Sequence, residues 1–274
     1  MRNLMKTGLF RLKKQKAFWI SLLLMMVFGL VRTLSLNGDP DSTLASGFFI
    51  YVMILGLVMA VFCSLFIGTE YSDGTLRNKI IAGCSRPSLV LSNFLLCSLA
   101  GMVFCFGYLI SALAVGLPLF GGLGTSMPIL LETAGCTLLV SCSYAALFTL
   151  INLLNSNKAV SAITCLLTAL LLLGQGFDSL SLLNQPERLQ IVEGMPEGEF
   201  PTAEWIENPA YLNPQERKAV SFLADFLPGG QALQLSWMIG EPAHPKPVLA
   251  LYALIQILIF NGIAVLLFSR KDLK

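Results

Sequence analysis

Six long apolar runs constrain the fold of this chain more than any other feature of its sequence. About 20 consecutive apolar residues in a helix cross the hydrocarbon core of a bilayer, where a helix bonds its own backbone polar groups. The charged fraction is 12%, well below the roughly one quarter typical of soluble domains, so a water-soluble globule is excluded. The runs predict an all-α membrane protein with transmembrane helices at Ala17–Leu36, Leu44–Gly68, Ser88–Leu117, Ile129–Leu154, Ala159–Gln175 and Val248–Phe268.

The third and fourth runs come from one uncharged stretch, residues 87–131, that is too long for a single crossing. Pro118, the glycine-rich segment 121–124 and Pro128 interrupt it. Proline removes a backbone donor and glycine favours turns, so these residues predict a tight turn between two helices.

Residues 1–16 combine apolar and basic side chains with a helical period. The pattern is typical of an amphipathic helix lying on an anionic leaflet, and it is equally compatible with a basic anchor for the first span. The apolar run that follows has no small-residue cleavage site, so a removed signal peptide is not expected. The apolar positions are Met1, Leu4, Met5, Leu9 and Leu12, and the basic positions are Arg2, Lys6, Arg11, Lys13, Lys14 and Lys16.

The distribution of charge predicts the orientation of the helices. The net charge is only +2, which argues against a nucleic-acid-binding protein. When the termini and the links 69–87 and 155–158 are placed on one side, that side holds 13 basic and 3 acidic residues, a charge of +10. The other side holds 5 basic and 13 acidic residues, a charge of −8. Because basic connections stay in the cytoplasm, we expect both termini to be cytoplasmic.

The segment 176–247 is the one long polar block, and we expect it to form a small helical extracellular cap. Its aromatic residues supply apolar material for folding. Asn213 and Glu216 have the spacing of a capping box around a proline, so a helix is expected to begin there. A second short helix, Gln231–Ile239, is expected at the outer interface with Trp237 as its aromatic anchor.

Several kinds of chemistry have few residues to support them. His244 is the single histidine and lies in the polar block, so catalysis or metal binding by histidine within the membrane is not expected. The seven cysteines lie in or beside the spans without CxxC spacing, which favours packing thiols over a metal, redox or disulfide role. Glu132, the one acidic residue associated with a span, fits an interfacial or a substrate-site role. No phosphate-binding loop is present, so we expect the chain to bind no cofactor and to hydrolyse no ATP by itself.

A stripe of small residues follows the second span at every fourth position: Gly56, Ala60, Ser64 and Gly68. Small side chains let another helix approach closely. The stripe fits packing within one subunit and a dimer contact equally well.

The link between the second and third spans, residues 69–87, is short and mixed in charge. Glu70, Asp73 and Arg77 have the spacing of residues on one helical face, with Asp73 and Arg77 at i, i+4. Residue chemistry alone favours an ordinary turn with local salt bridges.

The same link carries Glu-Tyr-x-x-Gly-Thr-x-Arg at positions 70–77, which resembles the signature of the ABC-2 permeases, the membrane subunits of ATP-binding-cassette exporters. The resemblance extends to the basic N-terminal helix, the six spans and the large segment between the last two, as in type V exporters. It implies that 69–87 forms a coupling helix docked on a separate ATPase subunit, which holds ATP and Mg²⁺. Many members carry a lysine where this chain has Asn93. The residues expected to couple to the ATPase are Glu70, Tyr71, Ser72, Asp73, Gly74, Thr75, Leu76, Arg77 and Asn78.

The resemblance divides the chain into a cytoplasmic interfacial helix (1–16), five spans with the coupling helix (17–175), an extracellular segment (176–247) and a last span with its tail (248–274). It implies a homodimer with two ATPases in a bacterial cell membrane, exporting an amphipathic or hydrophobic substrate such as a peptide. Drug or lipid efflux is an alternative. A membrane scaffold or sensor that transports nothing is another.

Overall fold

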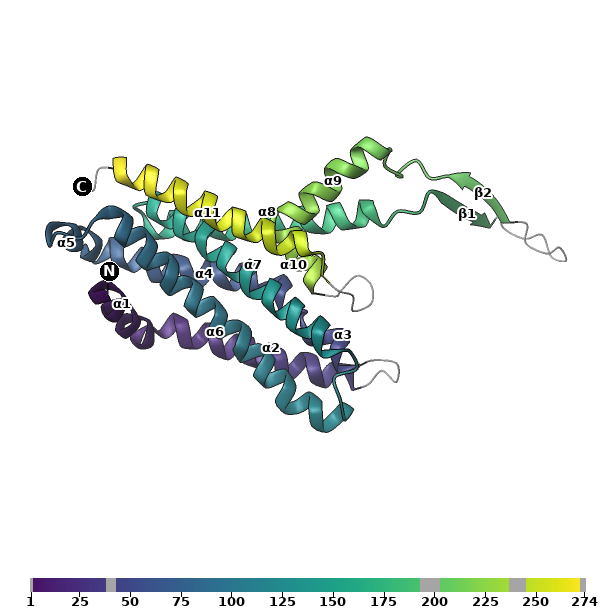
Figure 1. The fold of residues 1–274 in the computed structure, drawn as a ribbon, viewed down its shortest axis with the longest axis horizontal. Helices are drawn as coiled ribbons and strands as arrows, with labels where there is room; N and C mark the ends of the chain where they lie inside the picture. The colour runs from purple at the N-terminus through teal and green to yellow at the C-terminus, as the bar shows by residue number, and fades with distance from the viewer. Residues whose placement is uncertain (1, 38–42, 193–202, 237–244, 272–274) are drawn as a thin grey trace.

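Among the residues described by the computed structural model, six helical segments are long and apolar enough to cross a membrane (Figure 1). The described residues are 2–37, 43–192, 203–236 and 245–271. This confirms the all-α membrane fold. The segments are α2 (Lys16–Leu36), α3 with α4 (Leu44–Phe48 and Tyr51–Ser72), α6 (Arg86–Phe120), α7 (Met127–Leu154), α8 (Lys158–Leu183) and α11 (Pro247–Arg270).

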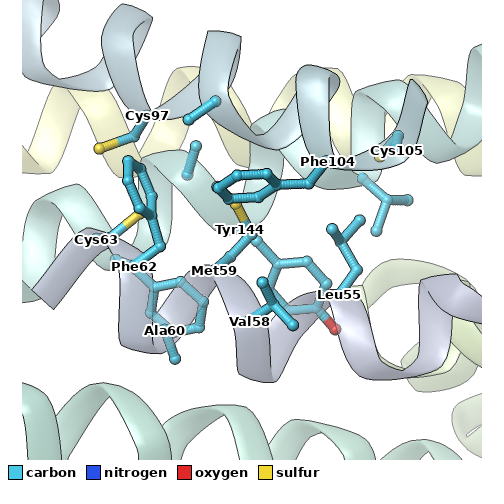
Figure 2. Packing of buried hydrophobic residues seen from close by; sticks show 14 of the residues in the cluster. Leu55, Val58, Met59, Ala60, Phe62, Cys63, Cys97, Phe104, Cys105 and Tyr144 are labelled. Carbon is cyan, nitrogen blue, oxygen red and sulfur yellow. The ribbon is translucent and has the colours of Figure 1, made fainter. Parts of the chain in front are cut away.

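Three of these helices form the centre of the bundle. In the most apolar stretches of α4, α6 and α7, 67–72% of the residues are buried, against 22–28% in α2, α8 and α11. Large side chains of the central helices pack together, among them Met59, Phe62, Phe104 and Tyr144 (Figure 2). The outer faces of the peripheral helices keep exposed apolar side chains such as Leu258, so in a membrane these faces meet lipid or another protein chain.

The connection between α6 and α7 is the tight turn that the sequence predicts. Gly121 ends α6 with a φ angle of +68°, and Gly124 has a φ angle of +77°. Positive φ angles favour glycine because it has no Cβ. α7 then begins at Met127, with Pro128 in its first turn.

Both ends of the described chain lie at the same end of the bundle, together with α1 (Arg2–Lys14) and the short α5 (Thr75–Ile81) (Figure 1). We call this the terminal end and the opposite one the distal end. α1 packs on α6, with Gly8 against Leu96, and contributes Leu12 to the buried core. Its apolar face is therefore covered at least in part by protein.

The distal end carries a projecting arm that the sequence predicts only in part (Figure 1). α8 continues to Leu183, about two turns beyond the expected end of the fifth span at Gln175. It is followed by an antiparallel hairpin of β1 (Arg188–Val192) and β2 (Ala203–Glu207). The helical cap that the sequence predicts therefore also includes a two-stranded sheet, which the sequence does not indicate.

The first cap helix begins where the sequence predicts. α9 (Pro214–Phe226) starts at a capping box in which the Asn213 side chain accepts the Glu216 backbone N–H at 2.9 Å. The Glu216 carboxylate accepts the Asn213 backbone N–H at 3.2 Å. The cap satisfies backbone donors that the first turn of a helix leaves unbonded.

The second cap helix differs from the expected interfacial helix over Gln231–Ile239. α10 spans Pro228–Leu235, and its residues are almost all buried against α8 and α9. Gly229 and Gly230 explain the difference, because they lie directly against backbone atoms of α8 and α9 where a side chain would not fit. Trp237, the expected anchor, lies outside the described residues.

The small-residue stripe on α4 is occupied within the chain. A Cβ atom added to Gly56 would lie 2.8 Å from the Tyr144 ring on α7, and one added to Gly68 would lie 2.9 Å from the Lys158 side chain on α8. The other two residues of the stripe are also buried. This geometry corresponds to packing within one subunit, and a second chain on the stripe would have to displace α7 and α8.

Among the described residues, no group of three or more histidine, cysteine or acidic side chains is placed to hold a metal ion. All seven cysteines are free thiols, and each except Cys84 is buried. Glu132 lies near the start of α7 and lines a groove beside α11 with Pro247. His244 lies outside the described residues.

Candidate functional site

A glycine divides the link between α4 and α6 into two helical pieces. α4 ends at Ser72, Gly74 has a φ angle of +65°, and α5 begins at Thr75. A Cβ atom at Gly74 would meet no atom within 4 Å, so its backbone conformation and not a close contact within the chain requires glycine.

The expected common helical face of Glu70, Asp73 and Arg77 is therefore wrong. Such a face requires one uninterrupted helix, and the helix ends between Glu70 and Arg77. Glu70 is 1% exposed, whereas Asp73 and Arg77 are both exposed. Within the described structure, Asp73 and Arg77 form no ion pair, and the ion pairs of Glu70 are formed with other elements.

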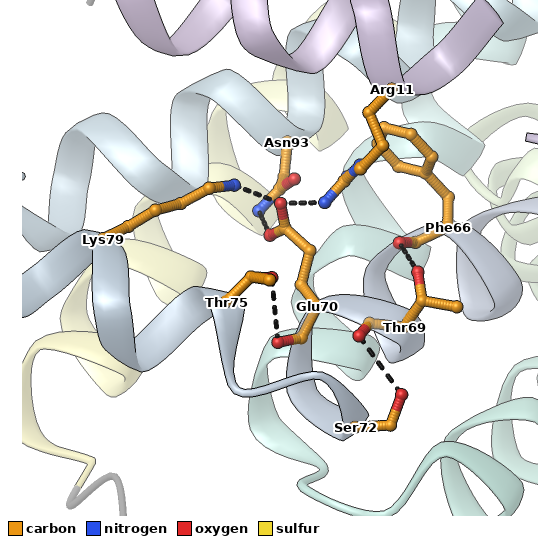
Figure 3. Close-up of polar contacts among 8 residues, drawn as sticks. All are labelled: Arg11, Phe66, Thr69, Glu70, Ser72, Thr75, Lys79 and Asn93. Atoms are coloured by element: carbon orange, nitrogen blue, oxygen red, sulfur yellow. Dashed lines mark hydrogen bonds and ion pairs between the residues drawn. The ribbon is translucent and has the colours of Figure 1, made fainter. Parts of the chain in front are cut away.

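The Glu70 carboxylate is the centre of a buried polar cluster at the terminal end (Figure 3). Arg11 of α1 and Lys79 of α5 both form ion pairs with its Oε1 atom. Asn93 of α6 donates from its Nδ2 atom to Oε2 at 3.2 Å. One carboxylate at the end of α4 thus joins α1, α5 and α6.

Packing and a backbone contact support this cluster. The Arg11 guanidinium lies 3.9 Å from the centre of the Phe66 ring, a cation–π geometry. The Thr75 hydroxyl donates to the backbone carbonyl of Glu70 at 3.2 Å, which ties the start of α5 to the end of α4. Because Glu70 is buried, the loss of its cationic partners would leave a costly unpaired charge.

Tyr71 belongs to a second cluster, in which the last turns of α7 and α11 meet α4. Its hydroxyl donates to the backbone carbonyl of Leu153. Lys271, directly after α11, donates to the Tyr71 hydroxyl at 3.1 Å and to the carbonyls of Leu153 and Leu154 at 3.0 Å each. The last carbonyls of a helix lack partners within it, so Lys271 caps α7. Partial burial lowers the pKa of Lys271 below its ordinary value.

Arg86, at the start of α6, completes the second cluster. Its Nη1 atom donates to the backbone carbonyl of Phe268 at 2.7 Å and to that of Lys271. Its guanidinium lies 5.8 Å from the centre of the Phe268 ring. The end of α11 is thereby fixed to α6 as well as to α4 and α7.

The predicted coupling residues divide into buried anchors and an exposed surface. Glu70 and Leu76 are each 1% exposed, and Tyr71 is partly buried. Ile81, at the end of α5, is 73% exposed although it is a large aliphatic residue. Exposed apolar side chains beside polar ones are typical of protein contact surfaces. The exposed members of the predicted set are Ser72, Asp73, Thr75, Arg77 and Asn78.

Sequence reasoning missed several members of this site, among them Arg11, Lys79, Arg86, Lys271 and Ile81. The charge distribution gives some indication of Arg11 and Lys79. Glu70 is one of 3 acidic residues on a side predicted to hold 13 basic residues. A basic partner for Glu70 is therefore expected, but spacing along the chain does not select which one. For Ile81 no signal distinguishes an exposed isoleucine from a buried one.

The fold and the site together define a multi-pass membrane protein that presents a short exposed helix beside buried ion pairs at one end of its bundle. The family model described as ABC-2 family transporter protein matches residues 4–174, and the chain belongs to this family. The match contains the whole link and the Glu70 cluster. The chain is therefore an ABC transporter permease, and its family implies partnership with an ABC ATPase subunit. A search of curated proteins found no match.

Proposed function

We propose that this chain is the membrane subunit of an ABC exporter and that α5 with its flanking residues docks on a separate ATPase subunit. The observation that carries the proposal is the division of the link. Asp73, Arg77 and Ile81 are exposed, while Glu70 and Leu76 anchor the same segment in the bundle. A segment that is exposed on one side and anchored in the bundle on the other can bind a partner and pass the partner's movement to the helices.

The two polar clusters supply a route for that movement. A displacement of α5 acts through Lys79 on Glu70, and through Glu70 on Arg11 of α1 and Asn93 of α6. Tyr71, next in sequence, joins the same segment to α7 and α11. In the proposed mechanism, ATP-driven closure of two ATPases moves both links of a homodimer and opens the pathway away from the ATPases.

ATP and Mg²⁺ belong to the ATPase subunit in this proposal, and the chain itself is not an enzyme. The terminal end faces the cytoplasm of a bacterial cell, as the +10 charge of that side favours. The exposed apolar faces of the peripheral helices provide surfaces for a second copy and for lipid. The cargo is an amphipathic or hydrophobic peptide, because a mainly apolar pathway provides no counter-charge for a strongly charged solute.

Co-purification with an ATPase tests the proposal. The full-length chain is expressed in membranes with a candidate ABC ATPase, and retained ATPase is measured after solubilisation. We expect capture by the wild type and at least tenfold weaker capture by an Arg77→Ala, Ile81→Ala double variant, with insertion unchanged. Arg188→Ala, at the distal end, is the matched control and should capture as the wild type does.

Reconstitution with the captured ATPase then separates transport from scaffolding. Stimulation of ATP hydrolysis by an amphipathic peptide, with movement of the peptide across the vesicle membrane, supports the exporter. A chain that captures no ATPase, or that functions unchanged with Glu70→Ala and Arg77→Ala, is a scaffold or sensor. Stimulation by a lipid or drug but not by peptides would assign a different cargo.

A further inference from the structure

A pocket of about 630 Å³ lies at the distal end, between α8 and α9 and beside the start of α11. Its wall on α8 is formed by Leu180, Leu183 and Asn184. Four residues of α9 at helical spacing form the opposite wall, and Lys246 closes one side. The α9 residues are Pro214, Arg217, Lys218 and Ser221.

Three basic side chains line this pocket. Arg217, Lys218 and Lys246 are three of only 5 basic residues on a side of the protein that carries 13 acidic ones. Lys246 forms an ion pair with Asp225 at 2.8 Å, so one of the three charges is compensated. Glu216, the neighbouring acid on α9, accepts a hydrogen bond from the Asn213 backbone N–H and does not line the pocket. The pocket therefore keeps a local positive charge in acidic surroundings.

The arginine of the pocket has unused hydrogen-bonding capacity. Arg217 donates from Nη2 to the backbone carbonyl of Leu183 at 2.7 Å, and its guanidinium lies 5.5 Å from the centre of the Tyr211 ring. These contacts hold the guanidinium in place. Its Nη1 atom is buried and has no hydrogen-bond partner within the described part of the chain. A fixed guanidinium with a free donor is suited to a phosphate or carboxylate oxygen.

Two helices place the pocket at the level of lipid head groups. Leu180 and Asn184 lie about 33 and 39 Å along α8 from Lys158, at a rise of about 1.5 Å per residue. Lys246 lies about 36 Å along α11 from Arg270 by the same measure. The hydrocarbon core is about 30 Å thick, and head groups extend the bilayer to about 40–45 Å. If Lys158 and Arg270 lie at one edge of the hydrocarbon core, these lengths place the basic side chains of the pocket just beyond its other edge.

We propose that this pocket binds the phosphate of an anionic lipid head group in the leaflet at the distal end. Arg217 and Lys218 contact the phosphate oxygens, and Leu180 and Leu183 face the glycerol and the first acyl carbons. A lipid is favoured over a dissolved anion, because the acidic residues of this side repel free anions while a lipid is confined to the leaflet. The proposal does not depend on the ATPase partner or on the direction of transport.

Lipid binding to the purified full-length chain tests this proposal. Native mass spectrometry in detergent compares dioleoyl phosphatidylglycerol with dioleoyl phosphatidylcholine, which carries no net charge. We expect the wild type to retain phosphatidylglycerol preferentially and Lys218→Glu to bind it roughly tenfold more weakly, since each basic residue near an anionic lipid contributes measurably. Lys218 is exposed and makes no hydrogen bond in the described structure, so this variant is expected to fold. Lys246→Gln is a second variant, expected to weaken binding in the same direction.

The matched control is Arg188→Glu, which reverses an equal charge on the hairpin of the same end, outside the pocket. It should leave phosphatidylglycerol binding unchanged. Equal binding by Lys218→Glu and the wild type, or an equal loss in Arg188→Glu, would overturn the proposal. Inorganic phosphate at the lipid's concentration should not displace the lipid, and displacement would assign the pocket to a soluble phosphate instead.

Discussion

Arg11 and Glu70 form an ion pair that joins two segments 59 positions apart in the chain. Arg11 lies on α1, and Glu70 is the first residue of the motif at positions 70–77, at the end of α4. The pair fixes α1 to the segment that carries the exposed link. Movement of either segment must therefore move the other or break a buried ion pair.

Glu70→Gln removes the charge of the first cluster and keeps the shape of the side chain. We expect a loss of about 2 kcal/mol in stability, because Arg11 and Lys79 lose their counter-charge while both remain partly exposed to solvent. Thermal unfolding of the purified chain in detergent measures the loss. Asp73→Asn, an exposed acid of the same link, is the control and should change stability by less than about 0.5 kcal/mol. Equal effects of the two variants would contradict the cluster.

Gly74→Ala tests the glycine that separates α4 from α5. We expect a loss of about 1–2 kcal/mol from the positive φ angle alone, since no neighbouring atom opposes a Cβ there. Gly74→Asn should cost less, because asparagine tolerates this conformation. Gly262→Ala is the control: it lies inside α11 with open space around it and should stabilise the chain slightly. A neutral Gly74→Ala would argue that the link adopts another conformation.

Two glycines of the α4 stripe should respond differently to alanine. Gly56→Ala places a Cβ against the Tyr144 ring, so we expect a loss of about 1–3 kcal/mol from overpacking. Gly68→Ala meets the flexible side chain of Lys158 and should cost less. Unfolding and oligomeric state are measured together by size-exclusion chromatography after heating. A Gly56→Ala variant that keeps its stability but loses dimerisation would assign the stripe to a contact between chains.

Lys271→Met removes the donor that holds the end of α11 to α7. We expect a loss of about 1–2 kcal/mol, because the carbonyls of Leu153 and Leu154 lose a charged donor. ATPase capture should persist, since the exposed surface of the link is unchanged, but coupling of ATP hydrolysis to cargo should weaken. Arg270→Gln changes the neighbouring basic residue, which is exposed, and serves as the control. If cargo stimulated ATP hydrolysis by the bound ATPase equally in both variants, the second cluster would have no role in coupling.

Much of the fold follows from local sequence signals. The six spans, the turn at Gly121 and the capping box at Asn213 depend on residues close together in the chain, and the structure contains each of them. The burial of α10 does not follow from such signals. It depends on the contact of Gly229 and Gly230 with the backbones of other helices. From the sequence, Pro-Gly-Gly indicates only that a helix ends there.

The candidate site is predictable in position but not in its contacts. The motif at 70–77 marks the link, yet helical spacing places Glu70 on one face with Asp73 and Arg77 and pairs the last two with each other. The structure instead pairs Glu70 with Arg11 and Lys79. The positive φ angle of Gly74 ends the helix and invalidates the spacing. Lys271 and Tyr71 are 200 positions apart, and their contact follows from the packing of whole helices.

Site-specific photo-crosslinking tests whether the exposed face of α5 contacts an ABC ATPase. A photo-crosslinking amino acid is placed at Ile81, which is 73% exposed at the terminal end, and in a second variant at Phe222, which is 50% exposed on α9. Membranes containing the chain and its ATPase are then illuminated. We predict a crosslink to the ATPase from position 81 and none from position 222. A crosslink from position 222, or none from position 81 while the ATPase remains bound, would show that α5 is not the docking surface.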